Sequence, residues 1–153
     1  MTMGLLPLLT QEGEGKRRAG LPVVLDTNII LDVFVFNDPA AEPIRQGLAA
    51  NALNWLATQP MRGELARVLA YPKIIQRLRF YGLILDAVLH KFDQHAHLVD
   101  AAPKCTLTCK DADDQKFIDL AVHHKAVLIS KDKHILCMQK RLIAYEIRAQ
   151  KAL

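Results

Sequence analysis

Two short runs of apolar residues each end at an aspartate. The run Val23-Val24-Leu25 stops at Asp26, and the run Ala126-Val127-Leu128-Ile129 is followed by Ser130-Lys131-Asp132. Continuous Val, Leu and Ile runs are typical of strands that are buried on both faces of a parallel sheet. Because open α/β sheets bind ligands at the carboxyl ends of their strands, both aspartates are predicted to lie at one functional edge.

Segments with helical spacing alternate with strand-like runs along the rest of the chain. Strands are predicted at about 22–26, 53–57, 96–99, 126–129 and 142–147. Helices are predicted at about 42–50, 59–70, 74–80, 83–95 and 133–140, with a further helix opening at 111–114. This alternation predicts the α/β class, as a three-layer α/β/α fold with a central, mainly parallel sheet of roughly five strands.

Composition narrows the class of protein. The chain has 153 residues, of which 51% are hydrophobic and 24% charged, which is ordinary for a globular protein. We predict a flexible leader over residues 1–20 and a single domain over 21–153, long enough to bury a core. No apolar run approaches the roughly 18 residues of a membrane-spanning helix, so no membrane association is expected.

Cysteine content and charge bear on location and partners. The leader places its apolar piece before its basic residues, the reverse of a secretory signal. Three cysteines, an odd number, favour a reducing cytoplasm over a disulfide framework. A formal net charge of +4 is compatible with a polyanionic partner but does not require one.

Two further acids are predicted to face the same sheet edge. Asp114 lies one helical turn before Phe117, in line with the buried face of its helix, and Glu64 flanks the apolar stripe of the helix at 59–70. Carboxylates at close range raise one another's pKa or require a cation. An all-oxygen set of ligands suits Mg²⁺ or Mn²⁺.

Taken alone, each acid also has an ordinary structural interpretation. Asp26 and Asp132 could simply end a strand or form a turn, Asp111 and Asp114 could cap a helix, and Glu64 could be a surface residue. The four acids at matching positions are much harder to explain as accidents.

Four segments, in order and spacing, resemble a known family. They are Val24 to Asn28, Gly63 to Leu69, Cys109 to Phe117, and Leu128 to Asp132. Together they look like a PIN domain, the small nuclease fold used by ribonuclease toxins of bacterial toxin–antitoxin modules. The resemblance spans about residues 22 to 147. Lys131 departs from the family pattern, which often has a small residue such as Gly there.

The resemblance implies a Mg²⁺- or Mn²⁺-dependent endoribonuclease that cleaves single-stranded RNA. The metal and catalytic residues it implies are Asp26, Glu64, Asp114 and Asp132. The residues expected to support the site are Asn28, Ser130 and Asp111. Candidate phosphate contacts are Lys110, Lys116 and Lys131. We expect RNA, a protein antitoxin and a second copy of the chain in a homodimer as partners, and a cytoplasmic location.

Other interpretations remain open. A catalytically silent PIN-fold module that binds RNA or protein differs from the nuclease only in a cleavage assay. A phosphoryl-accepting receiver domain also keeps acids at strand ends, but its paired upstream acids and strand-end lysine are not clear here. A zinc site at Cys105 and Cys109 with upstream histidines has loose spacing. His123 and His124 are expected to end a helix, where a cationic histidine favours the helix dipole, and no catalytic role is expected of them. Trp55 is expected in the core.

Overall fold

The computed structural model of the protein describes residues 20–153. The leader predicted over residues 1–20 therefore lies outside the described residues, apart from Gly20. The division of the chain into a leader and one domain stays a prediction.

A parallel sheet of five strands lies at the centre, in the order β4-β3-β2-β5-β6. The strands are β2 (Leu21–Leu25), β3 (Leu53–Ala57), β4 (His97–Leu98), β5 (Val127–Ile129) and β6 (Ala149–Gln150). The central strand β2 pairs with β3 on one side, with Val23 opposite Trp55, and with β5 on the other, with Val24 opposite Leu128. The two apolar runs that end in acids are thus neighbouring parallel strands, as predicted.

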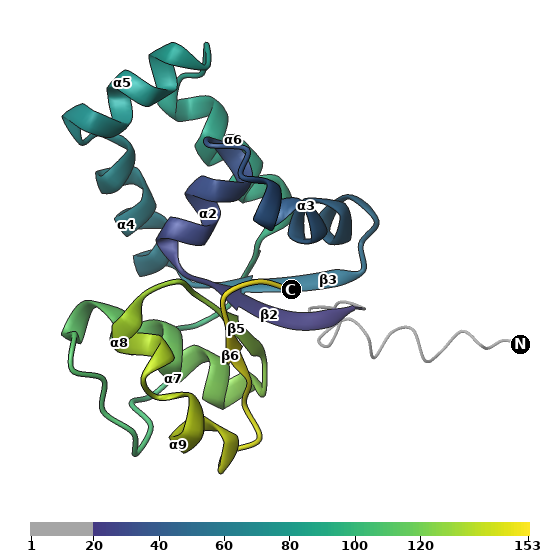
Figure 1. Cartoon of the computed structure of the whole chain (residues 1–153), viewed down its shortest axis with the longest axis vertical. Helices are drawn as coiled ribbons and strands as arrows, with labels where there is room; N and C mark the ends of the chain where they lie inside the picture. The colour runs from purple at the N-terminus through teal and green to yellow at the C-terminus, as the bar shows by residue number, and fades with distance from the viewer. Residues whose placement is uncertain (1–19) are drawn as a thin grey trace, which may run out of the picture.

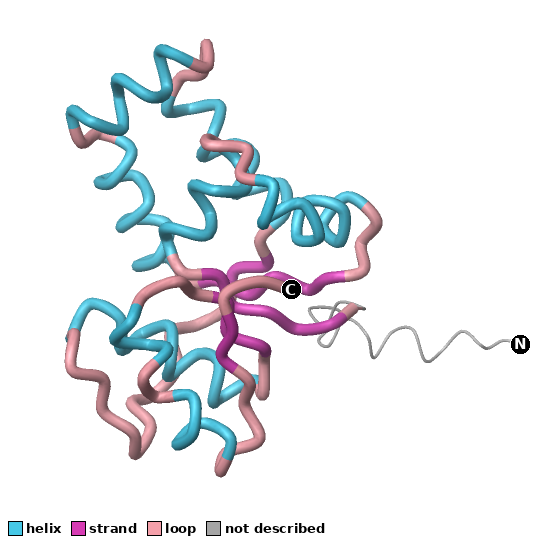
Figure 2. Tube along the Cα trace, in the orientation of Figure 1, coloured by secondary structure: helices cyan, strands magenta, loops and turns pink. Residues whose placement is uncertain are grey.

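Helices cover both faces of the sheet and complete the three layers (Figures 1 and 2). On one face lie α2 (Thr27–Phe34), α3 (Glu42–Ala49), α4 (Gln59–Leu69), α5 (Pro72–Phe80) and α6 (Leu85–His95). On the other lie α7 (Gln115–His124), α8 (Lys133–Leu136) and α9 (Gln139–Ile143). Two 3₁₀ turns, η1 (Pro39–Ala41) and η2 (Ala112–Asp114), precede α3 and α7. The predicted α/β/α class is confirmed.

The core forms between the sheet and these two helical layers. Trp55 is 1% exposed, as the sequence predicted, and its ring meets that of Phe92 edge-on at 5.0 Å. Phe117 and Ile118 of α7 are equally buried on the opposite face. Burying a large apolar side chain contributes roughly 1.5–3 kcal/mol, so these contacts fix the helices that carry the polar residues described below.

The two elements predicted nearest the C-terminal end of the chain were wrong. The predicted helix at 133–140 is two short helices, α8 and α9, and the strand expected at 142–147 is β6 at Ala149–Gln150. A short apolar run fits a helix or a strand equally well by periodicity alone, and here the first residues of the run end α9. Glu146 then takes a left-handed conformation with φ 65°, and Arg148 and Gln150 accept backbone hydrogen bonds from Leu128 and Ser130.

Smaller differences concern helix starts and a histidine. α5 begins at Pro72 and α6 at Leu85, each within two residues of its predicted start. His123 and His124 end α7, as predicted, and burial lowers the pKa of His124, which disfavours its cationic form there. No helix within residues 20–153 has the length and apolarity that crossing a membrane requires.

Candidate metal centre

Asp26 lies at the junction of β2 and α2. It is the N-cap of α2, and its Oδ1 accepts a hydrogen bond of 3.1 Å from the backbone of Ile29. Its Oδ2 accepts one from the hydroxyl of Ser130. The side chain is buried, which raises the pKa of Asp26 although the hydrogen bonds from Ser130 and Ile29 oppose the rise. The carboxylate is therefore held in a fixed direction at the sheet edge.

Ser130 connects the acids of the two neighbouring strands. Besides donating to Asp26, its Oγ accepts a hydrogen bond of 2.9 Å from the backbone N–H of Asp132. It is fully buried at the end of β5. Asn28 lies exposed in the first turn of α2, and its backbone N–H helps to stabilise the carboxylate of Asp26.

Asp114 approaches the sheet edge from the other helical layer, as the last residue of η2 and the N-cap of α7. It is 9% exposed, and its Oδ2 has no hydrogen-bond partner among the described residues. Burial and then the charges of Asp132 and Asp111 raise the pKa of Asp114 to about 7, with a smaller contribution from Asp26. An ionised carboxyl in this position lacks a partner, and a cation would supply one.

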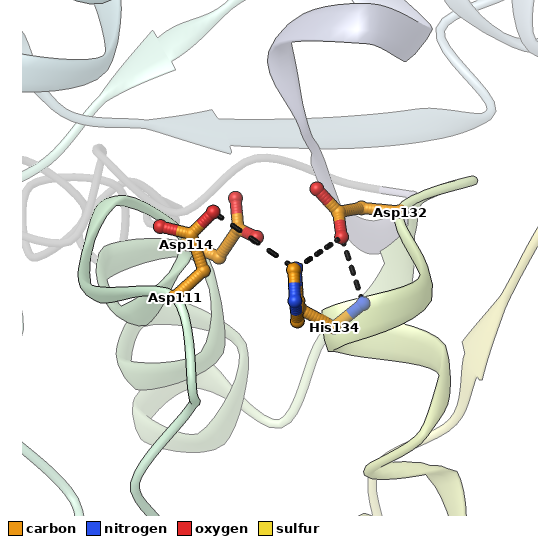
Figure 3. Close-up of side chains that lie close together, drawn as sticks. All are labelled: Asp111, Asp114, Asp132 and His134. Atoms are coloured by element: carbon orange, nitrogen blue, oxygen red, sulfur yellow. Dashed lines mark hydrogen bonds and ion pairs between the residues drawn. The ribbon is translucent and has the colours of Figure 1, made fainter.

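Asp111, Asp114, Asp132 and His134 form a compact group that we call the Asp–His cluster (Figure 3). The Nδ1 of His134 lies 3.4 Å from Oδ1 of Asp132 and 4.0 Å from Oδ2 of Asp111. One potential ligand atom from each residue lies within 4.8 Å of all the others. Opposite ligands of an ion with bonds of about 2.1 Å are about 4.2 Å apart, so the cluster fits one divalent ion after small side-chain movements.

Glu64, the fourth predicted acid, is bound by the protein itself. Its Oε2 accepts a hydrogen bond of 2.6 Å from the hydroxyl of Thr27, and its Oε1 forms an ion pair with Lys116. The same ammonium donates to the carbonyl oxygen of Asp113 at 2.6 Å. Glu64 is therefore not part of the Asp–His cluster, and Lys116 joins it to the segment that precedes α7.

The three lysines that were candidate phosphate contacts differ in their surroundings. Lys131 forms an ion pair of 2.5 Å with the buried Asp32 of α2, so its ammonium is held by a protein carboxylate. Lys116 is engaged with Glu64, and Lys110 is exposed beside Asp111. Of the three, only Lys110 forms no ion pair within residues 20–153.

The loop that carries Asp111 is fixed by two side chains of α7. Gln115 accepts a hydrogen bond from the backbone of Cys109 at 2.7 Å and donates to the carbonyl oxygen of Leu107 at 2.9 Å. Asp119 accepts one from the backbone of Cys105 at 3.0 Å. Both cysteines are free thiols, and neither belongs to the Asp–His cluster.

Sequence reasoning missed two residues of the site. Thr27, which binds Glu64, directly follows Asp26, but nothing in its position signals a contact with a residue so distant in the chain. His134 follows Asp132 by two residues, and that spacing was the available signal. A capping carboxylate accepts a hydrogen bond from the backbone two or three residues later, and here this bond places the imidazole of His134 beside Asp132.

The fold and site define an α/β protein with an acidic centre at the carboxyl end of a parallel sheet. The sequence matches the model of the PIN domain over residues 22–134. The chain therefore belongs to the PIN domain family.

The fold is also similar to that of a chain in the crystal structure of VapBC2 from Rickettsia felis bound to a DNA fragment from their promoter. The TM-score is 0.56 at 17% sequence identity, and the alignment covers 84% of this chain and 98% of the other. At that identity the similarity concerns the fold alone. A comparison with curated proteins gave no match.

Proposed function

We propose that the protein is a divalent-metal-dependent endoribonuclease that cleaves single-stranded RNA and serves as the toxin of a toxin–antitoxin module. The observation that carries this proposal is Asp114, a buried carboxyl group with an unpartnered Oδ2 among the described residues, beside Asp132 and near Asp26. Members of the PIN domain family are typically nucleases, which supports the class of activity.

The proposed metal is Mg²⁺ or Mn²⁺, held by carboxylates at the sheet edge, with Asp114 and Asp132 as the central pair. When bound, such an ion supplies an acidified water and stabilises negative charge on the phosphodiester. Asp26, oriented by the hydrogen bond from Ser130, adds a negative charge at that edge. Lys116 holds Glu64 in place, so that Glu64 can orient the attacking water. The expected products carry a 5′-phosphate and a 3′-hydroxyl.

Single-stranded RNA suits this site better than a duplex. An unpaired stretch can be splayed so that one phosphate reaches an acidic centre recessed at a sheet edge. The exposed Lys110, next to Asp111, offers a cation for a neighbouring phosphate. The net charge of +4 offsets the repulsion between the acids and the RNA backbone.

A protein antitoxin and a second copy of the chain are the proposed protein partners. The fold similarity to VapBC2, solved with promoter DNA, supports the antitoxin. Large apolar side chains are exposed at the two ends of α5 and just before α6, namely Tyr71 at 54%, Phe80 at 80% and Ile84 at 66%. Exposed apolar groups that lie near one another mark surfaces for protein partners. Light scattering of the purified chain tests the homodimer. Light scattering after co-expression with a small protein encoded by a neighbouring gene tests the antitoxin.

The decisive experiment incubates the purified chain with labelled RNAs in Mn²⁺, in Mg²⁺ and in EDTA. Asp26→Asn should lower cleavage at least a hundredfold, about 2.7 kcal/mol of barrier, while leaving the fold intact. Asp113→Asn, an exposed acid in η2, is the matched control and should cleave like the wild type. Equal cleavage by Asp26→Asn, or cleavage in EDTA that leaves cyclic phosphates, would refute the mechanism.

One observation favours the alternative of a catalytically silent PIN-fold module. The ion pair with Lys116 and the hydrogen bond from Thr27 engage both oxygens of Glu64. Under this alternative the chain binds RNA or protein, yet no metal ion produces cleavage that Asp26→Asn abolishes. The same incubation, combined with an RNA-binding measurement, separates the two functions.

A further inference from the structure

We propose that His134 is a direct ligand of the divalent ion, together with Asp111, Asp114 and Asp132, and that its nitrogen makes the site prefer Mn²⁺ to Mg²⁺. The proposal deepens the proposed function, and rests on it for the role of the site. It replaces a purely carboxylate centre by a mixed centre of three carboxylates and one imidazole.

The first argument is the geometry of the Asp–His cluster. Figure 3 shows the imidazole of His134 between Asp132 on one side and Asp111 and Asp114 on the other. Its Nδ1 is 3.4 Å from Asp132 and 4.0 Å from Asp111, and the four ligand atoms lie within 4.8 Å of one another. These separations are those of groups that surround one ion.

The second, independent argument is the state of Asp114. Its side chain is buried, and its Oδ2 has no hydrogen-bond partner within residues 20–153. Buried polar atoms are almost always paired, and an exception calls for a missing partner such as an ion. The unpartnered atom belongs to one of the four residues of the cluster.

The local backbone explains why these side chains meet. Asp111 caps η2 by accepting from Asp113 at 2.9 Å, and Asp132 caps α8 by accepting from the backbone of His134 at 2.7 Å. Each cap uses its Oδ1. The Oδ2 atoms remain available to face an ion, and the second cap places the imidazole of His134 beside the carboxylate of Asp132.

Asp26 and Glu64, the two other acids that the family resemblance implied as metal ligands, have partners within the protein instead. Both oxygens of Asp26 accept hydrogen bonds, from Ile29 and Ser130. Both oxygens of Glu64 are engaged by Thr27 and Lys116. In this structure Asp26 and Glu64 therefore act as positioning groups around the cluster.

The donor set determines which ion is preferred. Both ions bind carboxylate oxygen, but Mg²⁺ is the harder ion and loses water reluctantly, whereas Mn²⁺, at the weak end of the first-row transition series, accepts a nitrogen ligand more readily than Mg²⁺ does. Exchanging one oxygen ligand for the nitrogen of His134 therefore favours Mn²⁺ over Mg²⁺.

The test detects the nitrogen directly, in the full chain loaded with Mn²⁺. Electron spin echo spectroscopy of the wild-type protein should show coupling between Mn²⁺ and a ¹⁴N nucleus. His134→Gln should abolish the coupling and weaken Mn²⁺ binding at least about tenfold, since loss of even an outer partner of a metal ligand costs tenfold or more. Mg²⁺ binding, measured by calorimetry, should change much less.

Two further variants complete the design. His90→Gln makes the same substitution at an exposed histidine of α6 and should leave the coupling and both affinities unchanged. Asp111→Asn keeps the cap of η2 but removes a charged oxygen ligand. It should weaken Mn²⁺ and Mg²⁺ alike and retain the nitrogen coupling.

The outcomes separate this inference from the proposed function. Bound Mn²⁺ without nitrogen coupling in the wild type, coupling that persists in His134→Gln, or no Mn²⁺ binding overturns the inference. RNA cleavage without nitrogen coupling overturns it while the proposed function stands. Nitrogen coupling without any RNA cleavage supports His134 as a ligand and refutes the nuclease function.

Discussion

Replacing Asp114 with asparagine is expected to stabilise the metal-free protein at pH 8. Asp114 is 9% exposed, and its pKa is raised from 3.8 to about 7 by burial and by its acidic neighbours. A carboxyl whose pKa is raised on folding contributes most below its unfolded pKa, and this contribution is lost as the pH rises through about 7. Asparagine has a similar shape and no charge for burial to penalise.

The magnitude follows from the two pKa values. The difference between 3.8 and about 7 corresponds to about 4 kcal/mol at pH 8, because a tenfold change in an equilibrium is worth about 1.4 kcal/mol. Relaxation of the protein and water around the charge makes this an upper limit, and we expect a gain of at least about 1 kcal/mol. At pH 5 the corresponding limit is less than about 2 kcal/mol, so the advantage of Asp114→Asn should shrink by more than half.

Urea unfolding in EDTA at pH 8 and at pH 5 measures both effects. Asp113→Asn, which changes an exposed neighbour, is the control and should show neither. Addition of Mn²⁺ at pH 8 should stabilise the wild type and have little effect on Asp114→Asn. A variant that is less stable than the wild type at pH 8, or whose advantage does not change with pH, refutes the reasoning.

Three other predictions concern the same centre. Mn²⁺ affinity, measured by calorimetry, should fall about tenfold from pH 8 to pH 6, because a proton competes for Asp114, whose pKa is about 7. Ser130→Ala should lower the free energy of unfolding by about 1–3 kcal/mol, since the buried Asp26 loses a donor, and urea unfolding measures this. Lys116→Ala should slow RNA cleavage about tenfold in single-turnover kinetics, about 1.4 kcal/mol, because Glu64 loses the cation that holds it.

Each of these has a contrary result. A Mn²⁺ affinity that is constant between pH 6 and pH 8 would mean that no proton competes at the site. Wild-type stability in Ser130→Ala would mean that its hydroxyl is not needed by Asp26. Wild-type cleavage by Lys116→Ala would mean that Glu64 does not need Lys116 to position it. Lys140→Ala, which changes an exposed lysine of α9, controls for the loss of positive charge.

The sheet could be predicted because its signal is local. The runs at Val23–Leu25 and Ala126–Ile129 have the residues of doubly buried strands, and each ends at the acid that the fold places at the edge. The helix at Gln59–Leu69 could be predicted from Pro60 near its start, because proline is common in the first turn of a helix. Such features depend on residues a few positions apart, so the sequence alone contains them.

The partners of the acids could not be predicted in the same way. The ion pair between Glu64 and Lys116 joins residues 52 positions apart, and it exists because α4 and α7 approach the same edge from opposite faces. Neither residue has a local pattern that distinguishes it from an ordinary surface charge. The position of His134 likewise depends on how the short helix α8 leaves β5.

The hydrogen bond between Ser130 and Asp26 spans 104 positions, and it constrains the order in which the molecule assembles. Parallel pairing of β2 with β5 closes a very long loop, and non-local contacts of this kind form late and slowly. A partly synthesised chain that lacks β5 has Asp26 but neither Ser130 nor the ligands that follow it. The acidic centre is thus completed only after Ser130, Asp132 and His134 have been synthesised, and a nascent chain that stops before them lacks it altogether.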